Sequence, residues 1–401
     1  MSIAVPRRIL PVIVLSQFAG TSLWIAVNAI MPDLQQAWGL PATAVGTLTS
    51  AVQLGFVSGT LVFALLMLAD RFRPPRVFLV CSLLGALLNA GTLVADGRLS
   101  TLMALRFGVG FLLAGIYPVG MKIAASWYRE GLGAVMGVLI GALVLGTALP
   151  HGLRAVAGDS GAIATTIAGY QPWQVVVVGV SLLAALGGLA TALLVPVNPQ
   201  APRGTRITPK ALGLIWSDWR LRASVFGYFG HMWELYAFFV LVPLIVATRL
   251  AGTAVSAAAF WSIAAGFAGC VGGGLMVGRI GSARVAQAQL ATSAACCLAA
   301  PVMLSAPLPL FMAWLLLWGA TVVGDSPQFS TLTAQNAPAA VVGSVLTFTN
   351  CIGFAISVAS IELFVRAAHA WPLAQVLPWL ALGPVLGLWM LRPLLAARAN
   401  R

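Results

Sequence analysis

Residues 68–76 read Leu-Ala-Asp-Arg-Phe-Arg-Pro-Pro-Arg, and residues 278–284 read Gly-Arg-Ile-Gly-Ser-Ala-Arg. Both stretches are short basic breaks between long apolar runs, and each contains two arginines five positions apart. The arginine pairs are offset by 208 residues along the chain: Arg71 and Arg76, then Arg279 and Arg284. The chain therefore contains two related halves with equivalent loops.

A second pair of matching stretches strengthens the repeat. Gly115-Ile-Tyr-Pro118 and Gly324-Asp-Ser-Pro327 share their first and last residues at an offset of 209. Parallel repeats of this kind are typical of membrane proteins with a substrate site between the halves, near the middle of the bilayer. We therefore expect a small-molecule site in that position.

The composition sets the solvent that the chain requires. Of the 401 residues, 60% are hydrophobic and only 8% are charged, and the mean hydropathy is +0.98. An ordinary soluble domain has about 25% charged residues, and a disordered chain combines low hydrophobicity with high charge. Both classes are excluded, and the lipid bilayer is the expected environment.

Twelve apolar stretches have about the 20 residues that a membrane-crossing helix needs. The most polar segment, 197–221, separates the first six from the last six. The predicted fold is an all-α integral membrane protein with twelve transmembrane helices in two six-helix bundles, 1–196 and 222–401. The expected spans are 9–31, 43–69, 76–96, 100–127, 131–156, 173–195, 222–248, 253–277, 285–305, 308–330, 339–366 and 372–392.

The formal net charge of +13 is distributed in the breaks between spans and not on one face. We read it as a topology signal and expect no nucleic-acid partner. Sixteen basic residues fall on the side of the N-terminus: Arg7, Arg8, Arg71, Arg73, Arg76, Arg129, Arg203, Arg206, Lys210, Arg220, Arg222, Arg279, Arg284, Arg392, Arg398 and Arg401. Four fall on the other side: Arg98, Arg154, Arg249 and Arg366. The 16 to 4 ratio predicts that both termini are cytoplasmic. The expected membrane is a bacterial inner membrane.

Signatures of several enzyme classes are missing from the sequence. The five cysteines lie in apolar stretches without CxxC spacing, which argues against a metal site or a disulfide framework. Neither lysine lies in a Gly-Lys-Ser/Thr phosphate loop, and no HExxH motif is present. We expect no enzymatic activity, no metal and no cofactor, and we expect a monomer.

The loop after the second span resembles the loop motif of the major facilitator superfamily, Gly-x-Leu-Ala-Asp-Arg-x-Gly-Arg-Lys/Arg. Leu68, Ala69, Asp70, Arg71 and Arg76 match it, whereas Leu66 replaces the first glycine. The second copy keeps Gly274, Arg279, Gly281 and Arg284 but lacks the aspartate. Arg106 with Gly110 resembles the Arg-x-x-x-Gly motif of the fourth span. The resemblance covers essentially the whole chain and implies transport by alternating access.

The loop residues are expected to form a cytoplasmic gate. Asp70 at a helix end can pair with basic groups and with a helix N-terminus of the other half, and breaking that pairing would accompany opening of the cytoplasmic side. The alternative is that the arginines only hold the loop inside. The predicted gate residues are Asp70, Arg71, Arg76, Arg279 and Arg284.

Ionisable side chains within spans are costly and are functional candidates by default. Glu234 lies about 18 Å into the seventh span at 1.5 Å per residue, and His231 and Tyr228 precede it at three-residue spacing. Glu234 or His231 could carry a coupling proton. Asp325 is a second carboxyl candidate, close to Pro327. The alternatives are a structural glutamate bonded to a neighbouring helix and an ordinary helix-end aspartate.

Substrate contacts are expected from three sets of residues. Arg106 is the cationic candidate, with snorkelling to the membrane surface as its alternative; Lys122 is expected to snorkel. Polar residues of the first span share one helical face: Gln17, Thr21, Trp24 and Asn28. Further candidates are Tyr228, Trp233 and Asn350, although aromatic residues in spans often pack or face lipid.

Together these features predict a secondary transporter of a small organic anion or zwitterion that is coupled to protons. Sodium coupling is the less favoured alternative, because the sequence contains few carboxylates from which a sodium site could be built. The alternative is an exporter that exchanges drugs or lipophilic metabolites for protons.

Overall fold

The computed structural model describes residues 5–128, 132–159, 171–199 and 207–399. Within these ranges the regular structure is entirely helical. Twelve helical stretches are long and apolar enough to cross a membrane, which confirms the predicted number of spans. The first span is longer than expected, because the helical stretch continues to Trp38.

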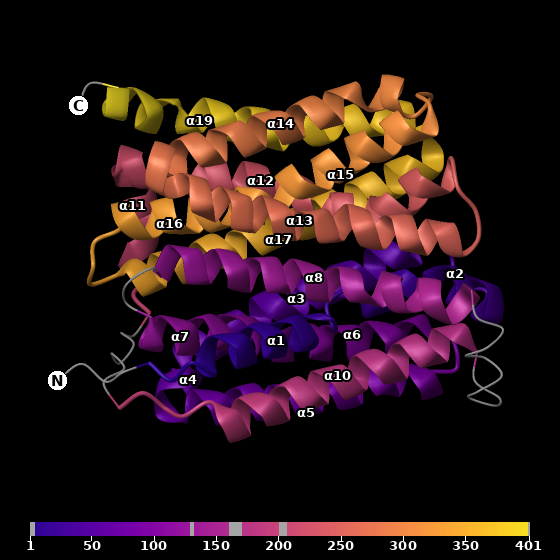
Figure 1. Ribbon diagram of the computed structural model, residues 1–401, viewed down its shortest axis with the longest axis horizontal. Helices are drawn as coiled ribbons and strands as arrows, with labels where there is room; N and C mark the ends of the chain where they lie inside the picture. The colour runs from indigo at the N-terminus through magenta and orange to yellow at the C-terminus, as the bar shows by residue number, and fades with distance from the viewer. Residues whose placement is uncertain (1–4, 129–131, 160–170, 200–206, 400–401) are drawn as a thin grey trace. The chain divides into compact units, whose positions relative to one another are not determined.

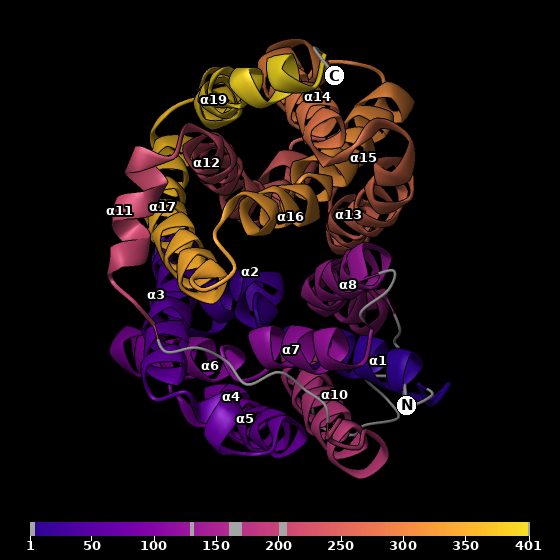
Figure 2. The same cartoon turned by 90° about the vertical axis from the view of Figure 1, so that its left-hand side faces the viewer.

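Two compact units make up the chain: residues 1–203 with 250–260, and residues 204–249 with 261–401. Within each unit the helices run alongside one another (Figure 1), as the end-on view in Figure 2 also shows. The division at residue 203 falls inside the expected linker 197–221.

The first unit contains the first six spans together with the start of the eighth. Its α3 packs on α6, α10 packs on α5 and α1, and α8 packs on α1. The elements are α1 (Ile9–Thr21), α2 (Ala26–Trp38), α3 (Ala44–Leu65), α4 (Leu68–Arg71), α5 (Pro74–Ala90), η1 (Gly91–Val94), α6 (Leu99–Leu113), α7 (Tyr117–Trp127), α8 (Leu132–Asp159) and α10 (Pro172–Leu194).

The second unit is organised around α12, which packs on α17 and α19, while α14 packs on α15. The short α11 is anchored because Ala211 and Ile215 are buried with Leu221 and Val345. The elements are α11 (Lys210–Ser217), α12 (Trp219–Ala247), most of α13 (Thr253–Ile280), α14 (Ser282–Met303), α15 (Leu308–Gly324), α16 (Ser326–Asn336), α17 (Val342–Ala370), α18 (Leu373–Val376), η2 (Leu377–Ala381) and α19 (Leu382–Ala399).

Three spans are interrupted, and two of the breaks coincide with the repeated sequence. The helix α7 begins at Tyr117 and α16 begins at Ser326, each with a proline in its first two positions. Proline has no backbone N–H and disfavours helical geometry in the residue before it, so each break follows from the sequence. The third break separates α1 from α2 at residues 22–25.

Glycines allow close helix contacts at equivalent places in the two units. A side-chain carbon added at Gly110 would collide with the carbonyl oxygen of Val52, and one added at Gly319 would collide with that of Ser262. Such positions let helix backbones approach one another. Gly110 and Gly319 differ by the repeat offset of 209, so the repeat includes this contact.

Candidate functional site

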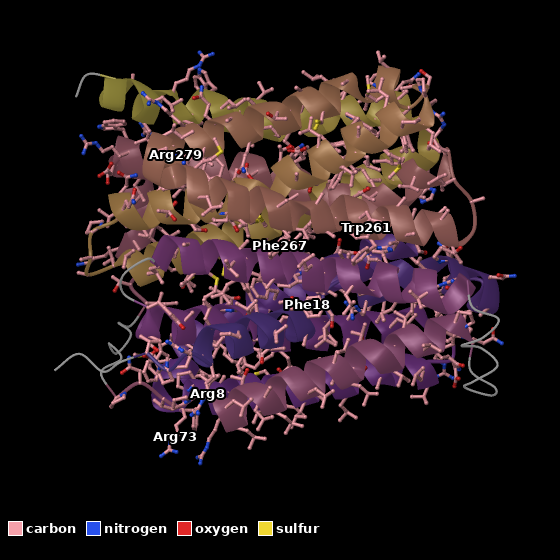
Figure 3. The ribbon with its side chains drawn as sticks, in the orientation of Figure 1. Arg8, Phe18, Arg73, Trp261, Phe267 and Arg279 are labelled. Atoms are coloured by element: carbon pink, nitrogen blue, oxygen red, sulfur yellow. The ribbon has the colours of Figure 1, made fainter. Side chains whose placement is uncertain are left out.

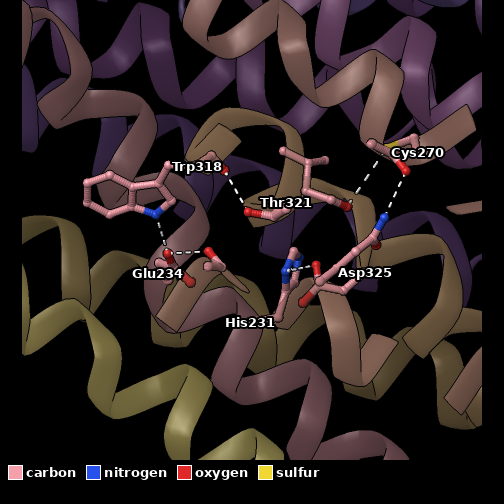
Figure 4. Close-up of polar contacts among 10 residues, drawn as sticks. His231, Glu234, Cys270, Trp318, Thr321 and Asp325 are labelled. Atoms are coloured by element: carbon pink, nitrogen blue, oxygen red, sulfur yellow. Dashed lines mark hydrogen bonds and ion pairs between the residues drawn. The ribbon is translucent and has the colours of Figure 1, made fainter. Parts of the chain in front are cut away.

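A buried carboxyl group lies at the centre of the second unit. Glu234 of α12 is 1% exposed, and its Oε1 accepts three hydrogen bonds, of which Figure 4 shows the one from Trp318. Ser293 Oγ donates at 2.6 Å, Cys297 Sγ at 3.1 Å and Trp318 Nε1 at 2.5 Å. The donors come from α14 and α15, so Glu234 links three spans. All three donors are neutral, and the carboxyl group therefore has no cationic partner among these contacts.

A second ionisable pair lies one helical turn away. Nδ1 of His231 is 2.8 Å from Oδ1 of Asp325, and both side chains are buried (Figure 4). The two atoms are at ion-pair distance, and neither side chain makes a well-aligned hydrogen bond within the described residues. The pair therefore lacks the fixed donors that hold Glu234.

Asp325 occupies the break between α15 and α16. Its backbone carbonyl accepts from the N–H groups of Gln328 and Phe329, but its side chain does not cap α16. The side chain is instead directed at His231. A carboxylate whose main role is to cap a helix would make well-aligned hydrogen bonds with the first N–H groups of that helix, and Asp325 makes none.

The side chains of the expected polar face of α12 contact different neighbouring helices. The ring of Tyr228 lies 5.7 Å from that of His231, and Gly353 of α17 lies against Tyr228. Trp233 packs against Phe364 of α17, with ring centroids 5.6 Å apart. Asn350 of α17 is half-buried. The three-residue spacing thus brings Tyr228 and His231 together, whereas Glu234 faces α14 and α15.

Arg106 is hydrogen-bonded to other residues of the first unit. It is 1% exposed, which excludes snorkelling. Its Nη2 donates to the carbonyl oxygens of Leu23 at 2.8 Å and Trp24 at 2.5 Å, and its Nη1 donates to Oδ1 of Asn89 at 3.3 Å. The two carbonyls belong to the break between α1 and α2, where regular helical partners end. Arg106 satisfies those groups, as a cation at a helix C-terminus does.

The polar face of the first span also has partners in its own unit. Asn28 Nδ2 donates to Thr49 Oγ1 at 2.9 Å, and Trp24 Nε1 donates to Gln53 Oε1 at 3.1 Å. Gln17 differs, because both its amide atoms are buried without a hydrogen-bond partner among the described residues. An unsatisfied buried amide is costly, which keeps Gln17 as a candidate contact for a polar ligand.

At the loop motif, Asp70 pairs with Lys122. Nζ of Lys122 of α7 is 2.5 Å from Oδ1 of Asp70 of α4. Snorkelling is the behaviour expected of Lys122 from its place in the span, and the pairing with Asp70 was not predicted. The pairing could have been predicted, because counting the spans places Asp70 and Lys122 at the same end of the bundle. The four gate arginines are exposed: Arg71, Arg76, Arg279 and Arg284.

Several residues that build these networks were not identified from the sequence: Ser293, Cys297, Trp318, Asn89, Gln53 and Thr49. They are common residue types in apolar spans, and only the tertiary packing identifies them. Among the described residues, no group of three or more His, Cys, Asp and Glu side chains could hold a metal ion.

Comparison with known proteins gives one family. A family model described as Major Facilitator Superfamily matches residues 13–360. No curated protein matches the chain.

Proposed function

We propose a proton-coupled transport mechanism, from the premise that this chain belongs to the major facilitator superfamily and is a membrane transporter of small solutes. The coupling site is the buried cluster of Glu234, His231 and Asp325 in the second unit. Transport proceeds by alternating access, in a bacterial inner membrane with both termini cytoplasmic, as the 16 to 4 distribution of basic residues favours.

The burial of these three side chains carries the proposal. Ionisable groups inside a membrane protein are expensive and mark ion pathways and proton relays. Glu234 can be accommodated in two protonation states. The ionised group uses the three donors on Oε1, and the protonated group retains Oε1 as an acceptor while it carries its proton on Oε2. Proton uptake therefore requires no rearrangement of Ser293 or Trp318.

The interrupted span connects the two ionisable groups. Trp318, which donates to Glu234, lies on α15, and Asp325 follows the last residue of the same helix. A change of charge at Glu234 or at Asp325 therefore acts on α15 and on its junction with α16. Discontinuous helices of this kind commonly form the ion sites of secondary transporters. The α15–α16 junction is accordingly the proposed link between proton binding and conformational change.

The contacts of Arg106 bear on the substrate. The preference for a small organic anion depended largely on this guanidinium, which is already bonded to Leu23, Trp24 and Asn89. Within the described residues, Arg106 is also the only buried arginine or lysine. A small zwitterion remains the first candidate, with the unsatisfied amide of Gln17 as one contact. Because Arg106 is already hydrogen-bonded within the protein, export of lipophilic compounds in exchange for protons is an equally supported second candidate.

The coupling site can be tested without a known substrate. Infrared difference spectra of the purified protein, recorded between mildly acidic and mildly alkaline pH, report protonated carboxyl groups. We expect a carboxyl band in the wild type that Glu234→Gln removes. Glu362→Gln is the matched control, because Glu362 pairs with exposed Arg366 at 3.2 Å. An unchanged band in a folded Glu234→Gln variant would exclude Glu234 as the proton carrier.

A flux assay then separates the two substrate candidates. Zwitterionic amino acids and lipophilic cations are first screened as ligands by thermal stabilisation, since a ligand of the folded state raises its melting temperature. The stabilising compound is then followed in proteoliposomes with an imposed proton gradient. Accumulation on the alkaline side supports symport of a small solute, whereas movement against the proton flow supports the exporter.

A further inference from the structure

A basic pocket lies at the end of the first unit, apart from the buried cluster described above. It has a volume of about 270 Å³ and is lined by Arg8, Arg73, Arg76 and residues 192–197. Arg8 immediately precedes α1, Arg73 and Arg76 lie at the start of α5, and residues 192–197 include the end of α10. Figure 3 shows Arg8 and Arg73 at the same end of this unit.

The pocket lining carries three positive charges and no acidic side chain. The nearby carboxyl group of Asp70 lines an adjacent pocket, where it is paired with Lys122. The first turn of α5, which contains Arg76, adds the positive end of a 17-residue helix. The electrostatics of the pocket therefore favour an anion.

The position of Arg8 suits a ligand with a phosphate group. Its Nε donates to the carbonyl oxygen of Leu194 at 3.1 Å, which orients the guanidinium at the end of α10. The Nη groups have no such bond among the described residues. The guanidinium group of an arginine binds phosphate oxygens through paired N–H groups. The three guanidinium groups of the pocket can therefore surround one phosphate.

The wall of the pocket offers apolar contacts for a second part of the ligand. Leu193, Leu194 and Val197 line it and are 80%, 45% and 45% exposed. These apolar side chains lie beside the arginines at the end of a membrane-spanning helix. An inorganic anion would use the guanidinium groups alone, whereas a phospholipid would use the arginines and the apolar wall together.

We propose that this pocket binds the headgroup phosphate of an acidic phospholipid, with an acyl chain along the exposed end of α10. Basic pockets between spans are a recognised form of lipid-binding site. The bound lipid connects the ends of α1, α5 and α10 and so stabilises the first unit. The inference is independent of the substrate and of the proton site.

Binding is tested on the purified full-length chain in detergent by native mass spectrometry. The probes are phosphatidylglycerol, phosphatidylcholine, glycerol phosphate and inorganic phosphate. We expect retention of phosphatidylglycerol above all others, and a loss of about fivefold in its affinity for each of Arg8→Gln, Arg73→Gln and Arg76→Gln, since one basic residue near an acidic membrane contributes about 1 kcal/mol. The arginines are exposed, so the variants are expected to fold.

Arg284→Gln is the matched control, because Arg284 is exposed and lies at the position of Arg76 in the second repeat. It should leave phosphatidylglycerol binding unchanged. Equal binding of phosphatidylcholine, or equal losses in the Arg284 variant and the pocket variants, would overturn the proposal. Inorganic phosphate that binds as tightly as phosphatidylglycerol would also overturn it, because the site would then recognise a free anion.

Discussion

Replacement of Arg106 by methionine separates a structural role from substrate binding. Methionine approximates the length of the side chain but donates no hydrogen bond. The change leaves the carbonyl groups of Leu23 and Trp24 and the amide oxygen of Asn89 without the partner they have in the native structure. Because all these groups are buried, water cannot readily replace the guanidinium.

The expected loss follows from three hydrogen bonds. Interhelical bonds in membrane proteins average about 0.6 kcal/mol, whereas bonds to charged groups in soluble proteins contribute about 1.5–3 kcal/mol. Relief of the cost of burying a charge offsets part of the higher figure. We therefore expect Arg106→Met to lower the free energy of unfolding by about 2–4 kcal/mol.

The assay is reversible unfolding in mixed detergent, combined with hydrogen exchange across the break between α1 and α2. Faster exchange near Leu23 should accompany the loss of stability. Arg98→Met, at an exposed position of the same unit, should change neither quantity. Unchanged stability together with lost ligand binding would refute the argument, because Arg106 would then act on substrate.

Two further predictions concern the packing of the first unit. Asp70→Asn combined with Lys122→Met in a double-mutant cycle should give a coupling of about 0.2–1 kcal/mol, because the pair is partly exposed; no coupling at low salt would mean that the pair does not form in solution. Gly110→Ala should destabilise by about 1–3 kcal/mol, since its side chain would meet the backbone of Val52. Gly133→Ala, with open space at that position, should be neutral or stabilising, and equal effects of the two alanines would contradict the close contact.

The spans and the repeat could be predicted because apolar length and prolines are local properties. A helix end was expected near Asp325 and Pro327, and α16 begins at Ser326; the equivalent break before Tyr117 was not predicted, although Pro118 lies there. Helical periodicity also grouped Tyr228, His231 and Glu234, but it could not indicate which neighbours they face. His231 meets the α15–α16 junction, whereas Glu234 meets α14 and α15.

Arg106 illustrates the same limit for buried charge. The free-energy cost of placing a charged side chain within the membrane identified Arg106 as unusual. That cost is the same whether the side chain binds substrate or has a structural role. The backbone carbonyls that it contacts exist as free acceptors only because the first span is interrupted after Thr21. No proline marks that interruption, so the sequence contained little sign of the partner that Arg106 would have.

The repeated halves have diverged in chemistry although they share the helix breaks before α7 and α16. At the repeat offsets, the counterparts of Glu234 and Asp325 are Ala26 and Ile116, neither of which can ionise. The buried carboxyl groups among the described residues are thus confined to one copy. Under the proposed mechanism, duplication did not double the proton stoichiometry, and the single cluster limits how many protons each turnover can use. The steepest solute concentration ratio that the transporter can sustain is limited accordingly.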